Sequence, residues 1–436
     1  MSVFDPLLAE LSDIRPIRHF GRISETRGGI LIARGLSAHS RLGDRVMIHR
    51  RDGQVLGGEI LVLGRRGAEI LAEGPVEGVS IDDRVEHLGR NHIAPDAGWI
   101  GRVIDPYGAP LDGRPLSRGS APRPLRAPPP PAARRKRLGG RLGTGLDAFN
   151  TLLPIVRGQR IGLFAGSGVG KTSLLGDLAR GVEADVVVLA LVGERGRELR
   201  EFIEEVLGPE GLARSVVVTA TSDLSPLARR RAALTAMSVA EHFRDEGHHV
   251  LLLCDSITRF AEAHREIALA GGESSSLRGF PPSTAHQIMA LAERAGPGED
   301  GQGDITALFT VLVAGSDMDE PVADILRGVL DGHVVLERSI AERGRFPAID
   351  LLRSVSRSLP AAATPGENAY IAEARRLIGA YERAEMMVQA GLYAPGSDPL
   401  TDRAIKLWPR LDAFMAGRDA VNSGESFGRL RKILEG

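Results

Sequence analysis

The hydrophobic residues of this 436-residue chain begin with a helical pattern. The first apolar positions recur every three or four residues, at Phe4, Leu7, Leu8, Leu11 and Ile14. This spacing predicts an amphipathic helix over residues 1–17 that starts near the Asp5-Pro6 pair. Such a helix either packs on its own domain or docks on a partner protein, and the pattern does not decide between the two.

The pattern changes between about residues 22 and 86, where short apolar runs are broken by glycine. The runs "GGILIARG", "DRVMIHRRDGQVLGGEILVLG" and "AEILAEG" are typical of β-strands. Asp52-Gly53 lies where a tight hairpin turn would join two of them. Several short strands at this spacing predict a small β-barrel, which we place at residues 18–90.

A boundary segment follows the predicted barrel. The stretch "GRVIDPYGAPLDGRPL" is rich in turn residues, and "RAPPPPAARRKRLGG" joins a proline run to a basic run. We expect the proline run to be extended and to cross the surface of the protein. We interpret the basic residues 134–137 as a solvated charge cluster.

From Gln159 onward, apolar runs alternate with helical stretches. The runs are "RIGLFA", "DVVVLALVG", "SVVVTAT", "HHVLLLCDS" and "ALFTVLVAGSD". Nearly continuous runs of this length indicate strands buried on both faces, so the pattern predicts an α/β domain with a parallel sheet wrapped by helices, at residues 91–362. The helical stretch "ENAYIAEARRLIGAYERAEMMVQAG" closes at Gly391 and opens a predicted C-terminal helical domain at residues 363–436.

The composition narrows the class of protein. The formal net charge is −1, which gives no general attraction to nucleic acid or to anionic membranes, although local patches stay possible. Cys254 is the one cysteine, so the chain cannot form an internal disulfide or a cysteine-based metal cage. The sequence has no run of 18 apolar residues and no signal-peptide pattern. We therefore expect a soluble protein of a reducing cytoplasm.

The stretch "AGSGVGKTS" at residues 165–173 is the strongest chemical signal. It follows the strand run "RIGLFA" and precedes a helical stretch, which is the context that a phosphate-binding loop requires. Glycines let backbone N–H groups turn toward phosphate oxygens at the positive end of the next helix. Lys171 would reach the β- and γ-phosphates, and the Thr172 hydroxyl would bind Mg²⁺. We assign these residues to binding of a nucleoside triphosphate: Gly166, Ser167, Gly168, Val169, Gly170, Lys171, Thr172 and Ser173.

The first position of the loop is Ala165 where the motif has glycine. This change is small, and it is tolerable if residue 165 needs no positive φ.

Two acidic residues lie at strand ends, where open α/β sheets bind their ligands. Asp255 ends the run "VLLLC" and would hold Mg²⁺, through water. Glu194 ends the run "DVVVLALVG" and could polarise the attacking water. On spacing alone this role competes with helix capping, because acidic residues after strands often cap the next helix.

Six stretches occur in one order with compatible gaps: "GQRIGLFAGSGVGKTSLLG", "VGERGRELREF", "LLCDSITRFA", "RGFPPS", "GSDMDEPVADILRGVLDGHVVLER" and "FPAIDLLRSVSRSLP". Together they resemble the flagellar and type III secretion export ATPases, relatives of the catalytic subunit of rotary ATP synthases. The resemblance covers nearly the whole chain, including the predicted barrel. It implies a RecA-type ATPase core and hydrolysis of Mg-ATP.

The resemblance also implies roles for single residues. The catalytic glutamate of the family falls on Glu194, and Arg195 beside it resembles a residue that helps to orient the γ-phosphate. Phe346 stands where relatives stack a side chain on adenine, and a buried core phenylalanine is the alternative. Arg357 resembles an arginine finger that a neighbouring subunit contributes. One loop departs from the family: relatives have a proline pair where this chain reads "GESSSL", so we leave the conformation around residues 273–277 open.

At the level of the whole protein, the resemblance implies a homohexamer that is cytoplasmic and peripherally associated with a membrane export apparatus. The implied partners are a stator-like regulatory subunit at the N-terminus, export chaperones with their cargo, and export-gate membrane proteins. We favour the flagellar system over the injectisome. A rotary synthase subunit is disfavoured because the C-terminal region lacks an acidic rotor-contacting run. An RNA helicase of the termination-factor type is disfavoured because the predicted barrel has almost no stacking aromatics, so we expect no specific nucleic acid.

Overall fold

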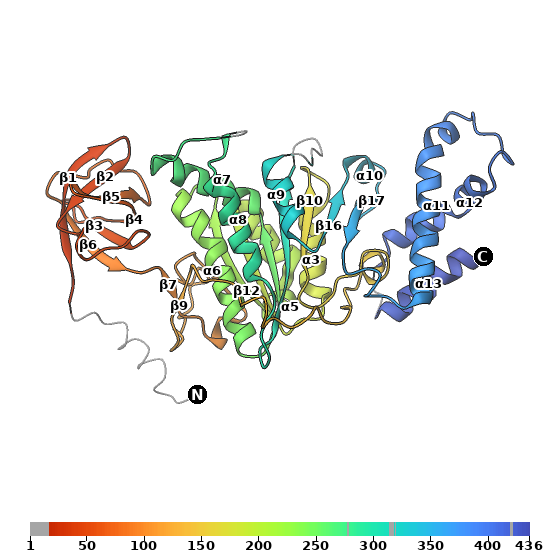
Figure 1. Cartoon of the computed structure of the whole chain (residues 1–436), viewed down its shortest axis with the longest axis horizontal. Coiled ribbons are helices and arrows are strands. Elements are labelled where there is room, and N and C mark those ends of the chain that lie inside the picture. The colour runs from red at the N-terminus through yellow and green to blue at the C-terminus, as the bar shows by residue number, and fades with distance from the viewer. Residues whose placement is uncertain (1–16, 277–278, 314–317, 319, 419–421) are drawn as a thin grey trace.

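The computed structural model describes residues 17–276, 279–313, 318, 320–418 and 422–436. The helix predicted over residues 1–17 lies outside these residues, except for Ile17. The described chain forms three parts in sequence order, with the barrel and the C-terminal helices at opposite ends of the molecule (Figure 1). In this part of the chain, no helix is long and apolar enough to cross a membrane.

The first part is a closed six-stranded barrel, as the sequence predicted. Its strands are β1 (Phe20–Arg27), β2 (Ile30–Arg34), β3 (Arg45–His49), β4 (Val55–Gly64), β5 (Gly67–Ala72) and β6 (Arg84–Gly89), in the order β1-β2-β5-β4-β3-β6. Asp52-Gly53 lies in the turn between β3 and β4, where Gly53 takes a positive φ of 83° that favours glycine. Buried apolar side chains, among them Ile48 and Ile70, fill the interior.

The second part is built on a nine-stranded sheet. Its strands are β8 (Arg102–Ile104), β10 (Arg160–Ala165), β11 (Val186–Glu194), β12 (Ser215–Thr221), β13 (His249–Asp255), β14 (Gly296–Pro297), β15 (Asp304–Leu312), β16 (Gly332–Leu336) and β17 (Ile349–Ser356). Eight of them lie in the order β17-β16-β10-β15-β13-β11-β12-β8, and β14 pairs with β15. A separate two-stranded sheet joins β7 (His92–Ile93) to β9 (Arg123–Pro124).

Five of the nine strands coincide with the apolar runs of the sequence, and they form the buried parallel centre. The sheet is not wholly parallel, because β17 runs antiparallel to β16 and β14 runs antiparallel to β15. The sequence analysis missed β8, because its three residues are embedded in a turn-rich stretch and gain their partner only by pairing with β12.

Helices cover both faces of the sheet. They are α2 (Asp147–Asn150), α3 (Lys171–Gly181), α4 (Gly196–Glu201), α5 (Gly208–Ala213), α6 (Pro226–Asp245), α7 (Ile257–Ala270), α8 (Ser283–Arg294), α9 (Pro321–Val329) and α10 (Arg338–Glu342), with the short 3₁₀ helix η1 (Ala97–Trp99) and the π-helical η2 (Phe202–Leu207). The apolar side chains of α3 join one hydrophobic core, and those of α6, α7, α8 and α9 join the other. The sheet therefore lies between two cores.

The third part consists of α11 (Pro365–Gln389), α12 (Pro399–Met415) and α13 (Ser423–Glu435). A reciprocal pair of hydrogen bonds between Thr364 and Glu367 caps the start of α11. The chain leaves this helix through Gly391, whose φ is 68°, at the position where the sequence predicted the helix to close. Arg429 of α13 pairs with the buried Asp147 at 3.1 Å, which attaches the helical part to the second part.

The basic run at residues 134–137 is not a wholly solvated cluster, so that interpretation was wrong for two of its members. The Arg135 side chain is 15% exposed and donates to the carbonyl oxygen of Glu293 at 2.6 Å. Lys136 Nζ lies 2.8 Å from the carboxylate of Asp304. The sequence pattern could not show these contacts, because the partners Glu293 and Asp304 lie more than 150 positions further along the chain.

Candidate active site

A cavity of about 670 Å³ opens at the edge of the sheet where the parallel strands β10, β11 and β13 end. The loop after β10 lines one side, and Glu194 at the end of β11 lines another. The start of α7, directly after β13, contributes Thr258 and Arg259. This is the edge at which open α/β sheets bind their ligands.

The loop conformation explains why alanine is accepted at position 165. Ala165 is the last residue of β10, and it is buried and paired in register with Leu312 and Leu336 on either side. It is not among the described residues with positive φ, whereas Gly168 and Gly170 are, at 76° and 81°. The loop therefore needs glycine at these two later positions, where the backbone turns toward the N-terminus of α3.

Lys171, Glu194 and Asp255 come together at this edge from three different strand ends. The Lys171 Nζ atom donates to the Asp255 Oδ1 atom at 2.5 Å and lies 3.8 Å from the Glu194 Oε1 atom. The same Asp255 oxygen accepts from the Thr310 hydroxyl at 2.6 Å. Parallel pairing of β11 with β13 sets this arrangement, because it brings the ends of the two strands side by side.

The environment of Glu194 changes its acidity. Burial raises its pKa to about 7, and the negative charge of Asp255 adds to this rise. The charge of Lys171 opposes the rise, whereas a hydrogen bond with Glu198 adds to it. A carboxyl group with a pKa near neutrality can both accept and release a proton at physiological pH, which is what a general base requires.

The side chains at this edge fit a magnesium ion better than a metal caged by protein alone. The described residues contain no group of three or more His, Cys, Asp and Glu side chains that could hold a metal ion. Mg²⁺ usually binds one or two carboxylates together with substrate phosphates and several waters. Asp255 and the exposed Thr172 provide one carboxylate and one hydroxyl next to the phosphate loop.

Arg195 is the one predicted catalytic residue near this edge whose side chain does not line the cavity. Its guanidinium group is 80% exposed and lies 3.1 Å from the Glu198 carboxylate. In this arrangement the Arg195 guanidinium group pairs with Glu198 and does not line the cavity. A role at the γ-phosphate would require a rotation of this exposed side chain.

Phe346 lies over the end of the phosphate loop. A Cβ atom placed on Gly170 would come within 2.9 Å of the Phe346 ring, so glycine at this position makes room for the aromatic side chain. The Phe346 side chain is 42% exposed, which excludes the alternative of a core phenylalanine. An exposed ring beside a phosphate loop is available to stack on a flat ligand.

Arg357 lies at the opposite edge of the sheet. It follows β17, which runs antiparallel to β16, and its backbone N–H donates to the carbonyl oxygen of Asp331 just before β16 begins. The five residues of β16 separate this edge from the phosphate-loop edge by roughly 16 Å at the usual rise of a strand. The structure therefore does not bring Arg357 to the cavity of its own chain.

The structure adds two residues that the sequence analysis did not assign. Arg259 lines the cavity, and its guanidinium group donates to Glu262 at 2.8 Å. Glu198 lines the cavity and hydrogen-bonds with Glu194. Arg259 could have been found from the sequence, because it lies four residues after Asp255, at the start of the helix that follows the same strand end.

The described part of the segment at residues 273–277 is held by Glu273 and Ser276, and Ser276 donates from its backbone N–H and its hydroxyl to the carbonyl oxygen of Phe280. The Glu273 carboxylate accepts from the backbone N–H and the hydroxyl of Ser283, at 2.9 and 2.6 Å. These bonds close the segment onto the start of α8 without a proline pair. Leu277 lies outside the described residues.

Comparison with known proteins places this site in a family. Residues 145–356 match the nucleotide-binding domain of the ATP synthase alpha/beta family, and residues 363–431 match the C-terminal domain of the type III secretion ATPase EscN. The chain is 45% identical over 438 residues to the flagellum-specific ATP synthase of Caulobacter vibrioides, which covers 98% of this chain and 99% of the relative. It is also 41% identical to a type 3 secretion system ATPase of Pseudomonas syringae pv. syringae, over 97% of this chain and 95% of the relative.

Solved structures agree with the sequence relatives. The assembled ATPase EscN of the enteropathogenic Escherichia coli type III secretion system matches with a TM-score of 0.87 and 36% identity, over 95% of this chain and all of that chain. EscN in complex with its central stalk EscO matches with a TM-score of 0.86 and 36% identity, over the same shares. The similarity therefore extends over all three parts of the fold.

Proposed function

The chain belongs to the flagellar and type III secretion export ATPase family, and from this premise we propose that it hydrolyses Mg-ATP to assist protein export during flagellum assembly. It is an ATP hydrolase of type III export. The flagellar assignment is supported by relatives named flagellum-specific ATP synthase at 41–45% identity. We propose that the energy goes to unfolding export cargo and releasing it from its chaperones at the export gate.

One observation supports the chemistry above the others: Lys171, Glu194 and Asp255 meet beside a glycine loop at a helix N-terminus. In the proposed reaction, the loop amides and Lys171 hold the β- and γ-phosphates, and the water that attacks the γ-phosphorus hydrogen-bonds to Glu194. Asp255 and Thr172 would hold Mg²⁺, which when bound neutralises charge on the phosphate oxygens. Phe346 would stack on the adenine.

Cations beyond Lys171 are needed, because charge builds up on the phosphate oxygens in the transition state. Arg259 already lines the cavity within the chain. We propose that Arg357 supplies a further charge to the site of a neighbouring copy in a homohexamer, and that Arg195 helps to orient the γ-phosphate. The position of Arg357 at the far edge of the sheet supports a role between subunits.

The remaining proposals concern organisation and partners. We propose domain boundaries at residues 1–17, 18–90, 91–362 and 363–436, supported by the end of β6 at Gly89 and the start of α11 at Pro365. We propose a stator-like regulatory subunit at the N-terminal segment, chaperones and cargo at the ring, and a peripheral position at the export-gate membrane proteins. A chain without residues 1–13 should keep its basal ATPase activity and lose the regulatory subunit in a pull-down.

A complementation experiment tests the proposed function. The gene is deleted and replaced by the unaltered form, by Glu194→Gln, or by Lys406→Ala, which changes an exposed lysine of α12. Export of flagellar filament protein into the medium should be restored by the unaltered and Lys406→Ala forms and not by Glu194→Gln. Normal flagella in the deletion strain together with loss of effector secretion would assign the chain to an injectisome instead. A many-fold, salt-sensitive stimulation of hydrolysis by single-stranded RNA would favour the helicase alternative.

A further inference from the structure

A group of buried polar side chains anchors the backbone on both sides of Arg357. The Arg357 side chain is itself exposed, and its guanidinium group donates to the carbonyl oxygen of Arg327 at 3.0 Å. By contrast, Ser358 directly after it is 8% exposed, and Ser356 directly before it is half-buried. Where an arginine on such a segment can reach depends on how firmly the backbone beneath it is held.

Gln159, the residue directly before β10, lies at the centre of this group. Its relative exposure is 0%. Its amide nitrogen donates to the carbonyl oxygen of Asp331 at 3.1 Å and to the hydroxyl of Ser356 at 3.2 Å. Its amide oxygen accepts from the backbone N–H of Val156 at 3.0 Å. Because a carbonyl oxygen can only accept and a backbone N–H can only donate, these partners fix the orientation of the amide.

The carbonyl oxygen of Asp331 connects Gln159 to Arg357. It accepts from the backbone N–H of Arg357 at 3.0 Å as well as from the Gln159 amide. Asp331 is in turn held by Arg160, whose backbone N–H and guanidinium group donate to its carboxylate at 3.0 to 3.2 Å. The acceptor of the Arg357 N–H is therefore fixed to the start of β10.

The hydroxyl of Ser356 receives the second hydrogen bond from Gln159. It also donates to the carbonyl oxygen of Pro154 at 2.8 Å. The hydroxyl of Ser358 lies 2.8 Å from that of Ser356 and 3.4 Å from the same oxygen of Pro154. The residues on both sides of Arg357 are therefore tied to the segment before β10.

This support is placed where the sheet gives the least of its own. The strand β17 is the outermost one of the described sheet, and its backbone is paired with β16 on one side. Its last residue, Ser356, pairs with Gly332, and Arg357 follows where the strand ends. Buried hydrogen bonds from Gln159 hold this end, and they are costly to lose because water does not replace them.

We propose that Gln159 is a positioning residue for Arg357: its amide holds Ser356 and the acceptor of the Arg357 N–H, so that the guanidinium group reaches the cavity of a neighbouring copy. This inference rests on the proposed role of Arg357 between subunits. A misplacement of about 1 Å in a catalytic group can lower turnover by roughly 10²-fold. Gln159 thus affects turnover at the neighbouring site and not ATP binding in its own chain.

The variant Gln159→Met tests the proposal, because methionine has nearly the same length but cannot donate or accept these bonds. We expect ATP affinity to stay within twofold and turnover to fall at least tenfold, as measured by binding titration and phosphate release. Ser356→Ala removes the hydroxyl on the other side of the contact and should also lower turnover. Ser356→Thr keeps the hydroxyl and should restore it. If Gln159→Met does not fold, Ser356→Ala replaces it in the mixtures below.

Mixed assemblies distinguish positioning from damage within the altered chain. Gln159→Met mixed with Glu194→Gln should release phosphate at least threefold faster than the sum of the separate proteins. In that mixture the first chain supplies an intact cavity and its neighbour a well-placed arginine. Gln159→Met mixed with Arg357→Ala should stay at the level of its components, because neither chain supplies a working arginine. The reverse pattern would show that Gln159→Met damages its own cavity through β10, and it would overturn the proposal.

The matched control is Thr235→Val on α6, which packs beside β11 and β12 at the other end of the strand order. It removes a buried hydroxyl that donates to the carbonyl oxygen of Pro106 at 2.7 Å, and it should keep full turnover. Loss of turnover in Arg357→Ala together with full turnover in Gln159→Met would contradict this inference alone. Full turnover in Arg357→Ala would overturn the proposed role of Arg357 and this inference with it.

Discussion

The two edges of the central sheet differ in how complete their chemistry is. At the edge where β10 ends, a glycine loop lies beside Lys171, whose ammonium group reaches the carboxylates of Asp255 and Glu194, and the Phe346 ring lies against the end of the loop. At the edge where β17 ends, Arg357 donates from its backbone N–H to Asp331 and from its side chain to the carbonyl oxygen of Arg327 at 3.0 Å, far from the phosphate loop. The groups at the first edge form a site within one chain, whereas Arg357 at the second edge lies away from the phosphate loop of its own chain.

This difference follows from strand direction. Parallel strands deliver their following loops to one edge, so residues after β10, β11 and β13 gather there whatever their distance in sequence. The antiparallel β17 delivers its following residue to the other edge. In the proposed mechanism, Arg357 therefore acts only where a neighbouring copy places its cavity beside it.

The largest expected effect comes from removing Lys171, the lysine at the edge where β10 ends. Lys171→Ala should abolish ATP binding, because the lysine contacts the phosphates in the ground state as well as in the transition state. Nucleotide-binding titration measures this. Lys406→Ala serves as the control, since it removes an exposed lysine on α12 and should bind ATP normally. Retained affinity in a folded Lys171→Ala protein would show that the loop does not hold the phosphates.

The second prediction tests whether Arg357 at one edge contributes to the cavity at the other edge of a neighbouring chain. Arg357→Ala should bind ATP normally and lose about 10³–10⁵-fold in turnover, the usual contribution of an arginine finger. Turnover of the unaltered protein should rise cooperatively with its concentration, because an isolated chain has no finger at its own site. The control Arg431→Ala, an exposed arginine of α13, should keep full turnover.

Mixing two inactive variants decides whether Arg357 acts between subunits. A mixed assembly of Arg357→Ala and Glu194→Gln contains interfaces in which one chain supplies the intact cavity and its neighbour the arginine. These interfaces should release phosphate. A mixture that forms mixed rings and stays as inactive as its components would refute action in trans.

The third prediction tests whether Glu194 acts as the general base. Glu194→Gln should leave ATP binding intact and lower turnover by about 10²–10⁴-fold, because a general base matters only when water attacks. Binding titration and phosphate release, measured on the same preparation, separate the two steps. Turnover near that of the unaltered protein would assign the base elsewhere.

The fourth prediction concerns the ring beside the loop. Phe346→Ala should weaken ATP binding by roughly tenfold to a hundredfold, because stacking of a base on an aromatic ring contributes about 1–3 kcal/mol. Phe346→Tyr keeps the ring and should bind ATP almost normally. Equal affinities of the alanine and tyrosine variants would mean that the ring does not contact the adenine.

The smallest expected effect is a shift in pH dependence. Below its pKa of about 7 the Glu194 carboxyl is protonated and cannot accept from water, so kcat/KM should fall about tenfold per pH unit on the acid side. Glu198→Gln removes a carboxyl that raises this pKa, so the acid limb should move to lower pH. An acid limb that stays in place after Glu198→Gln would show that Glu194 does not control it.

Much of this site could be predicted because its signals are local. The loop at residues 165–173 has its strand before it and its helix after it in the sequence, so its role follows without tertiary information. The positions of Glu194 and Asp255 could be found because strand ends are visible as the ends of apolar runs, whereas the choice of Glu194 as catalytic base over a helix cap came from the family resemblance. The acceptance of Ala165 rested on a local condition as well, that the residue needs no positive φ, and its strand conformation meets that condition.

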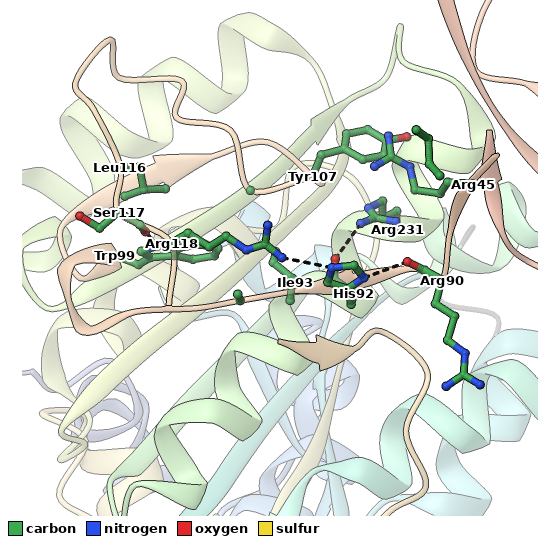
Figure 2. A pocket seen from close by; sticks show the side chains of 13 residues that line it. Arg45, Arg90, His92, Ile93, Trp99, Tyr107, Leu116, Ser117, Arg118 and Arg231 are labelled. Atoms are coloured by element: carbon green, nitrogen blue, oxygen red, sulfur yellow. Dashed lines mark hydrogen bonds between the residues drawn. The ribbon is translucent and has the colours of Figure 1, made fainter. Parts of the chain in front are cut away.

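Other features depend on partners far away in the chain. Lys136 looked solvated until Asp304 was placed beside it, and β8 looked like a turn until β12 paired with it. The stacking of Arg45 and Arg231 on the Tyr107 ring (Figure 2) has the same cause, because the two arginines are 186 positions apart in the chain. Local patterns record how each segment can bury its apolar side. They carry no record of which charges the finished packing brings together, so the sequence determined the elements and the nucleotide loop, and the tertiary structure decided the electrostatics between them.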